Sequence, residues 1–253
     1  MKGGTPARPA LWTLAGLIVF LGAWEGAVQA GLLPRNLVPP PSAVPHAFIS
    51  ELRNGFWLAS VKASLGHYLL GLLLGSALGV AFGMATALSA HLEAATSGIM
   101  RLLRPIPPLA WIPFALIWFG ASEGAAAFII AIGVFWVNVF AAMAAVRAID
   151  PGLLEVADAF GQGGLIPRLT KIVLPGAAPG ILAGLRSGLG QGWMAVVAAE
   201  LFGVAGVGQR MSDAAGLLAT DVLVVYMLTI ALLYALSDAG FSWISRRLLA
   251  WTP

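Results

Sequence analysis

The sequence predicts an all-α integral membrane protein with about six transmembrane helices. Of its 253 residues, 59% are hydrophobic and 10% are charged, with a mean hydropathy of +0.90. Soluble domains average about 45–50% apolar and about 25% charged residues. The apolar residues gather in continuous runs, many near the roughly 20 residues that cross a hydrocarbon core. Strands of a membrane β-barrel would instead alternate over about 10 residues.

The composition excludes several other classes of protein. The chain has no cysteine, which excludes a disulfide scaffold and a cysteine-ligated metal site. Its apolar content is too high for a disordered chain, and its 31 glycines follow no collagen period.

Six apolar runs follow one another along the chain. They are Leu11–Leu33, Ala63–Leu88, Pro105–Phe119, Gly124–Val146, Ile181–Phe202 and Val222–Ile244. The third run is short and rich in proline, so five spans remain an alternative. The first run also resembles a cleavable signal peptide, but its length and Glu25 favour a retained span. We expect a cytoplasmic N-terminus over residues 1–10 and one transmembrane domain over 11–253, with its core at about 55–245.

The basic residues predict the orientation of these spans. With a cytoplasmic N-terminus, nine basic residues lie inside and four lie outside. The inner set is Lys2, Arg8, Arg101, Arg104, Arg147, Arg168, Lys171, Arg246 and Arg247, and the outer set is Arg35, Arg53, Lys62 and Arg210. Both termini are therefore expected in the cytoplasm. Arg101 and Arg104 fit interfacial anchors better than substrate ligands.

Two runs carry glycine at every fourth position. The glycines are Gly71, Gly75, Gly79 and Gly83 in the second run, and Gly180, Gly184, Gly188 and Gly192 in the fifth. A four-residue step forms one ridge on a helix, and glycine lets another backbone approach closely. The ridges indicate either packing within the chain or a sliding or homodimer seam.

Prolines and one carboxylate are the candidates for a solute pathway or gate. Pro107 and Pro108 break the third run, and broken backbone in a membrane is tolerated where it is buried or lines a cavity. Two interpretations remain open: the prolines line a pathway, or they only kink a helix that packs within the protein. Glu200 is a functional candidate because an intramembrane carboxylate is costly, unless it is hydrated at the outer interface.

The neighbours of Glu200 cannot be assigned from the sequence. Arg186 lies roughly 21 Å away along a helix, too far to be its partner. His67, in the second run, fits an interhelical hydrogen bond better than a ligand role.

The inside loop at about 147–180 predicts two short helices. Asp150 fits an N-cap and Pro151 a first helical position, so a helix is expected over Pro151–Phe160. After a turn at Gly161, Gly163 and Gly164, a second helix is expected over Leu165–Leu174, which Pro175 ends. An apolar stripe of Leu153, Leu154, Ala157 and Phe160 suits a groove in another protein, the alternative being an ordinary loop.

This loop resembles the EAA loop of ABC importer permeases. The pattern is Glu-Ala-Ala, three residues, Gly and a stretch ending in Leu-Pro, matched here by Glu155-Val156-Ala157, Gly161 and Leu174-Pro175. Val156 replaces the middle alanine, and the stretch from Gly161 to Leu174 is one residue longer than usual. Four further segments resemble the sulfonate/taurine/nitrate group of these permeases: Val38–Val44, Arg104–Gly120, Val197–Gly203 and Arg246–Trp251.

The resemblance covers about Leu37 to Trp251 and implies a fold, a function and partners. The fold is a type I, MetI-like permease bundle in the bacterial inner membrane. Two copies of the chain bind two ABC ATPase subunits, and a periplasmic or lipid-anchored binding protein delivers a small anion for alternating access. Glu155, Ala157 and Gly161 shape the coupling helix, while Leu174 and Pro175 fix its return to the membrane. ATP and Mg²⁺ bind the partner ATPase, and no cofactor or nucleic acid is expected on this chain.

The residues themselves agree with a transport subunit that has no ATP site. The chain has no GxxxxGK[ST] phosphate loop, and no Ser/His/Asp or metal-ligand pattern suggests catalysis. A self-energised secondary transporter and an intramembrane enzyme are the alternative classes. An aromatic acid or a thiamine precursor is the alternative substrate.

Overall fold

The computed structural model describes residues 7–161 and 164–250, and within these residues it contains helices and connecting turns without a strand. The residues 1–6 of the expected cytoplasmic N-terminus, Gly163 of the expected turn and Trp251 of the closing motif lie outside the described residues.

Five described helices are long and apolar enough to cross a membrane, and there are six such segments if a bent pair of helices is counted as one span. The five are α1 (Ala7–Gln29), α3 (Phe56–Leu88), α6 (Glu123–Arg147), α9 (Leu174–Glu200) and α11 (Thr220–Leu248). The bent pair is α4 (Ala90–Leu103) followed by η2 (Pro108–Trp111) and α5 (Ile112–Phe119), with an angle of 92° between its arms. The expected third run is therefore only the second arm of this bent pair, whose first arm begins at Ala90.

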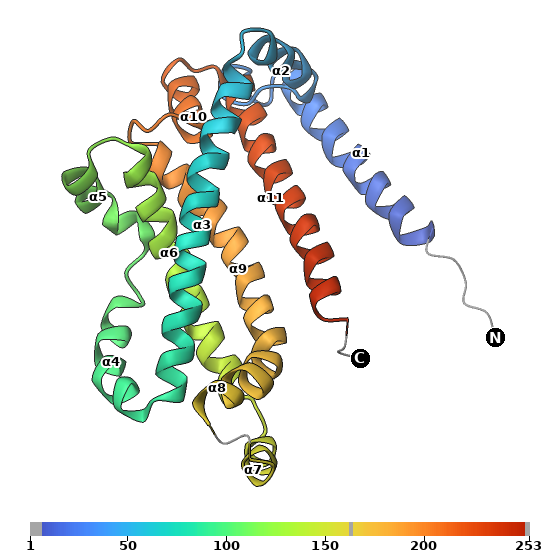
Figure 1. Cartoon of the computed structure of the whole chain (residues 1–253). Helices are drawn as coiled ribbons and strands as arrows, with labels where there is room; N and C mark the ends of the chain where they lie inside the picture. Colours follow the sequence, from blue (N-terminus) through green and yellow to red (C-terminus); the bar gives the residue numbers. More distant parts are fainter. Residues whose placement is uncertain (1–6, 162–163, 251–253) are drawn as a thin grey trace.

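Successive spans run in opposite directions, with the short helices at the two ends (Figure 1). One end holds η1 (Pro41–Ala43), α2 (Val44–Arg53) and α10 (Val207–Gly216). The opposite end holds α7 (Pro151–Ala159) and α8 (Leu165–Arg168). The start of α1 and the end of α11 both point toward the end with α7 and α8.

The first glycine ridge packs α3 against α6. A β-carbon on Gly71 would lie 2.6 Å from Cβ of Ile130, and one on Gly79 would lie 2.7 Å from the carbonyl oxygen of Phe135. Gly75 and Gly83 face α6 backbone in the same way. Only glycine permits this approach over the length of the two helices.

The second glycine ridge packs α9 against another part of α6. A β-carbon on Gly180 would lie 2.6 Å from Cβ of Ala145, and Gly184 contacts Ala141. Gly188 lies against Asn138, and Gly192 against Tyr68 of α3. The structure thus uses both ridges for packing within one chain, with α6 as the shared partner.

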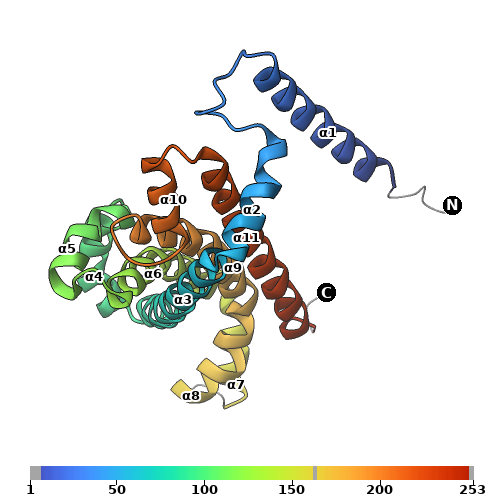
Figure 2. The same ribbon diagram turned by 90° about the horizontal axis from the view of Figure 1, so that it is seen from above.

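The helix α1 stands away from the rest of the bundle. Figure 2 shows it projecting to one side, connected through the segment that contains η1. Its described contact with that segment is polar, because Glu25 accepts hydrogen bonds from the Ser42 backbone N–H at 3.1 Å and the Ser42 hydroxyl at 2.9 Å. Its large apolar side chains are exposed over much of its length, as expected of a helix in lipid.

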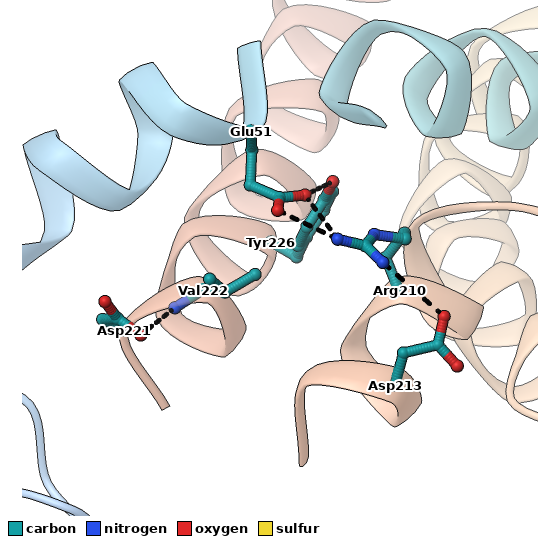
Figure 3. A network of polar contacts seen from close by, with 6 residues as sticks. All are labelled: Glu51, Arg210, Asp213, Asp221, Val222 and Tyr226. Carbon is teal, nitrogen blue, oxygen red and sulfur yellow. Dashed lines mark hydrogen bonds and ion pairs between the residues drawn. The ribbon is translucent and has the colours of Figure 1, made fainter. Parts of the chain in front are cut away.

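A buried ionic network joins the short helices at the η1 and α10 end. Arg210 of α10 donates from Nη2 to both carboxylate oxygens of Glu51 of α2 at 2.9 Å, and the Tyr226 hydroxyl of α11 donates to Oε2 at 2.6 Å (Figure 3). Burial lowers the pKa of Arg210, but the contacts with Glu51 and Tyr226 outweigh it and raise this pKa above its ordinary value. This network ties the short helices α2 and α10 to the first part of the long helix α11.

Candidate functional site

The loop between α6 and α9 forms the two short helices that its sequence predicts. Asp150 caps the first one, since its Oδ1 accepts a hydrogen bond from the Gly152 N–H at 2.8 Å, and α7 begins at Pro151. Gly161 follows α7 with a φ of +72°, a left-handed backbone conformation that glycine adopts without strain. In Figure 1 the loop projects from its end of the bundle.

This loop presents a mixed apolar and acidic surface. Large apolar side chains are exposed on it: Leu153 (56%) and Val156 (55%) of α7, Phe160 (79%) directly after α7, and Ile166 (72%) of α8. Glu155, on α7, is also exposed, and Ala157 lies on the same helix. Exposed apolar side chains rimmed by polar ones are typical of a protein-binding surface.

The return from this loop differs from the expectation in one respect. Pro175 does not end a helix, because α8, the π-helix η3 (Leu169–Val173) and α9 follow one another without a break. Pro175 is the second residue of α9, directly after this π-helix, so its missing N–H falls within a continuous helix. The π-helical turn closes i→i+5 hydrogen bonds and so takes up one residue more than an α-turn. The π-helix η3 lies between Gly161 and Leu174, the stretch that is one residue longer than in the EAA pattern.

The bend between α4 and α5 borders an open cavity of about 390 Å³. Its lining combines the expected prolines with a cation, an amide and aromatic rings: Arg104, Ile106, Pro107, Pro108, Gly133, Trp136, Val137, Phe140 and Gln191. The side chain of Pro108 lies 2.9 Å from where a β-carbon on Gly133 would be, so a glycine in α6 makes room for the bend. Pro107 and Pro108 therefore line a cavity as well as bending the span.

Arg104 does not lie where the sequence suggests. It follows α4 at the bend, and its guanidinium carbon lies 4.4 Å above the ring of Phe140, which is within α6. It is thus part of the cavity and not an anchor at the end of a span. Arg101 lies in the last turn of α4, in the same bent pair. Without these two arginines the basic residues still divide unequally, seven to four, so the predicted orientation does not depend on them.

Gln191 is a cavity residue that the sequence analysis missed. It is a polar side chain within an otherwise apolar stretch of α9, and this contrast is the signal that could have identified it. The bend of α4 and α5 brings it together with Arg104, although 87 positions separate them in the sequence. A guanidinium and an amide both donate hydrogen bonds, so this wall suits an anionic or polar solute.

Glu200 lies away from this cavity, inside the protein. Its side chain has no exposed surface, so the alternative that Glu200 is hydrated at the outer interface is wrong. Its Oε2 accepts hydrogen bonds from the Ser64 hydroxyl at 2.9 Å and the Gly208 N–H at 2.8 Å, and Oε1 lies 3.2 Å from Nδ1 of His67. The sequence could not show these partners, because α3 and α10 supply them.

The remaining intramembrane charges also form a pair. Arg186 of α9 donates from Nε and Nη2 to the carboxylate of Asp238 of α11, at 2.7 and 2.8 Å. Across the described part of the chain, no group of three or more His, Cys, Asp or Glu side chains is placed to hold a metal ion. The arrangement offers a cavity, a projecting loop, a buried carboxylate at Glu200 and an exposed ion pair between α9 and α11.

Comparison with known proteins gives a consistent result. Residues 71–250 match the family model described as binding-protein-dependent transport system inner membrane component. The putative aliphatic sulfonates transport permease protein SsuC of Escherichia coli is 35% identical over 97% of this chain and 93% of its own length. The taurine permease TauC of the same organism is 32% identical over 97% and 91%, and the bicarbonate permease CmpB of Synechococcus elongatus is 30% identical over 94% and 89%.

Solved structures with the same fold are also ABC transporters. An inward-facing form of the MetNI methionine ABC transporter has a TM-score of 0.64 at 22% identity, covering 75% of this chain and 94% of the matched chain. An amino acid ABC transporter has a TM-score of 0.62 at 18% identity, covering 79% and 96%. The expected MetI-like fold is therefore confirmed. The chain belongs to the family of binding-protein-dependent transport system inner membrane components, the membrane-spanning permease subunits of ABC importers.

Proposed function

We propose that two copies of this chain form the membrane channel of an importer for a small anion, driven by two ATPase subunits. The relatives named for aliphatic sulfonates, taurine and bicarbonate all carry solutes that are anionic or zwitterionic near neutral pH. A binding protein outside the membrane delivers the solute. The observation that carries the proposal is the combination of a projecting loop for an ATPase and an arginine-lined cavity for an anion.

The α7–α8 loop is the proposed ATPase contact. Its exposed Val156 and Phe160 offer apolar surface, and the exposed carboxylate of Glu155 offers a partner for a basic group. Because α8, η3 and α9 are continuous, a displacement of the docked loop is transmitted directly to α9. ATP-driven closure of the two ATPase subunits thereby moves a helix that borders the cavity through Gln191.

The cavity at the α4–α5 bend is the proposed passage of the solute. The planar guanidinium of Arg104 matches the oxygens of a sulfonate or carboxylate group, and Gln191 adds amide donors. Pro107 and Pro108 leave the backbone of the bend with fewer N–H donors, which a cavity-lining segment tolerates. The second copy supplies the facing half of this passage.

A cytoplasmic position for both termini follows from the same arrangement. The start of α1 and the end of α11 point toward the α7–α8 end, which must face the cytoplasm to meet an ATPase. The basic residues favour this orientation independently. Reporter fusions at Pro253 and within residues 204–221 test it, and a signal from the same side for both would contradict it.

Reconstitution tests the transport function. Proteoliposomes that contain the permease, its ATPase and its binding protein are loaded with ATP and Mg²⁺ and given labelled taurine, methanesulfonate, bicarbonate or nitrate. Uptake of at least one anion that requires ATP is expected. Uptake of only a thiamine precursor would overturn the anion class, and uptake of only benzoate would replace the small anions with an aromatic one. Uptake driven by a proton gradient without the ATPase would support a secondary transporter instead.

Two measurements test the partners. The chain has no cysteine, so Phe160→Cys provides a single crosslinking site at the loop, and Leu217→Cys provides an exposed control site at the opposite end. Only the former is expected to crosslink to the ATPase. The mass of the purified complex is expected to correspond to two copies of this chain. A mass that corresponds to one copy would exclude the homodimer.

A further inference from the structure

A second charged groove lies between the α7–α8 ends of α9 and α11, separate from the cavity at the bend. It has a volume of about 430 Å³. The α9 side of the groove is lined by Pro179, Leu182, Ala183 and Arg186. The α11 side is lined by Phe241, Ser242, Ser245 and Arg246, with Leu249 just after the helix. The lining is thus mixed: five apolar side chains stand beside two arginines and two serines.

The two arginines of the groove differ in their partners. Arg186 is neutralised by its bidentate ion pair with Asp238. Arg246, in the last turn of α11, has no carboxylate within 4 Å among the described residues. The groove therefore carries a net positive charge at its Arg246 end, where an anion would be attracted.

Ser242 adds a hydrogen-bond donor without a partner. Ser237 and Ser245 on the same helix donate to the carbonyl oxygens four residues earlier, at 2.7 and 2.8 Å. The Ser242 hydroxyl is buried and makes no hydrogen bond within the described structure. An unpaired buried hydroxyl costs free energy, which a bound oxygen ligand in the groove would recover.

We propose that this groove binds the phosphate-type oxyanion of an anionic phospholipid headgroup. Arg246 would pair with the phosphate and Ser242 would donate to one of its oxygens. Leu182, Phe241 and Leu249 supply apolar surface for the adjoining acyl chain. Basic pockets between transmembrane helices on the cytoplasmic side are suited to such headgroups. The groove would then link the lipid around the permease to the α9 helix that leads from the coupling loop.

The neighbouring Arg247 provides a matched control. It has the same charge and the same place in the sequence pattern, but its guanidinium carbon lies 4.5 Å above the ring of Trp243 and it does not line the groove. Both arginines contribute equally to an inside-positive bias, so a difference between Arg246→Ala and Arg247→Ala isolates the groove from that general effect.

Native mass spectrometry and thermal unfolding of the full chain in detergent test the proposal, with phosphatidylglycerol, phosphatidylcholine or inorganic phosphate added. Phosphatidylglycerol is expected to be retained by the wild type and by Arg247→Ala. Arg246→Ala should bind it roughly tenfold more weakly, since a charged hydrogen bond is lost. Ser242→Ala, which removes only the hydroxyl, should weaken binding to a smaller extent.

The samples with inorganic phosphate show whether the bound oxyanion belongs to a lipid or to a free anion. Stabilisation by phosphatidylglycerol but not by inorganic phosphate shows that the lipid is the ligand. If inorganic phosphate alone stabilises the wild type and not Arg246→Ala, the site takes a free oxyanion and the lipid assignment is overturned. Equal retention of phosphatidylglycerol by Arg246→Ala and the wild type, or equal loss in Arg246→Ala and Arg247→Ala, would overturn the site itself.

Discussion

The carboxylate of Glu200 occupies the space beside Gly206 that a β-carbon would need. Gly206 precedes α10, and Glu200 ends α9, so the contact closes the turn between them. The carboxylate cannot move aside freely, because Ser64 and Gly208 donate hydrogen bonds to it and His67 lies beside it. Ser64 in turn accepts a hydrogen bond from the Val207 N–H at 2.9 Å. This cluster fixes α10 to α3 and α9.

Gly206→Ala should destabilise the protein for this reason. The added methyl group displaces the Glu200 carboxylate and breaks its hydrogen bonds, and overpacking of this kind costs roughly 1–3 kcal/mol. The φ of Gly206 is 161°, an extended value that other residues adopt, so the effect is steric. Thermal unfolding in detergent measures it. Gly216→Ala is the control, because nothing lies within 4 Å of its β-carbon position, and equal stability of the two variants would contradict the proposed contact.

Glu200→Gln separates a structural role from a role in the solute pathway. The amide keeps the shape of the side chain and one acceptor for Ser64 and Gly208, so the folded state should persist with reduced stability. Glu200→Ala should lose more, since buried donors are left unpaired at about 1–3 kcal/mol each. Because Glu200 does not line the cavity, uptake per folded Glu200→Gln molecule should equal that of the wild type. A severe loss of uptake at normal folding would instead restore Glu200 to the pathway.

Arg104→Gln should reduce anion uptake without removing the permease from the membrane. The change removes the positive charge from the cavity and leaves a polar side chain at the bend. A charged hydrogen bond to a solute oxygen contributes about 1.5–3 kcal/mol, so the apparent affinity for the anion should fall roughly tenfold or more.

Arg101→Gln is the control for Arg104→Gln. Arg101 is an exposed arginine of α4 whose Nε donates to the Ser97 carbonyl within its own helix. Initial uptake rates over a range of anion concentrations distinguish the two variants. Equal affinities for Arg104→Gln and the wild type would exclude Arg104 as a solute contact.

The sequence predicted the features that depend on local pattern. Apolar runs located the spans, and Asp150-Pro151 and Gly161 located the start and end of the α7 segment. The break at Pro107 and Pro108 was predicted, but the pairing of α4 with α5 was missed, because apolar content does not show that two segments at 92° belong together. The partners of Glu200 were missed as well, since they come from helices far apart in the chain and their choice depends on the packing of α3 with α9.

Gly161→Val should uncouple transport, whereas Gly161→Asn should not. Gly161 has a φ of +72° with open space around its β-carbon position, so backbone conformation and not crowding decides the outcome. Asparagine tolerates this region far better than a β-branched residue. Valine should redirect the chain between α7 and α8, lowering uptake and solute-stimulated ATPase activity together while membrane levels stay near normal. Equal activity of the two variants would remove the conformational argument.

Glu155→Ala should weaken the contact with the ATPase and leave folding unchanged. Glu155 is exposed on α7, and a carboxylate near a helix start contributes only about 0.3–1 kcal/mol to helix stability. Co-purification of the ATPase at increasing salt measures the contact, and the variant should lose the ATPase at lower salt than the wild type. Unchanged co-purification and unchanged uptake would together contradict a coupling role for Glu155.

Deletion of Thr170 should be tolerated, because it removes the extra residue that η3 accommodates. Thr170 is exposed, and its hydroxyl bonds only to the Ile166 carbonyl in the same helix. Without it the π-helical turn can become α-helical while α8 and α9 keep their faces. Deletion of Ser187, also exposed but inside regular α9, instead rotates one side of the helix by about 100° and takes Gly184 and Gly188 out of register against α6. Membrane levels and uptake should therefore be near normal for the first deletion and lost for the second. Equal loss in both would show that the π-helical turn is required for coupling and does not merely absorb one residue.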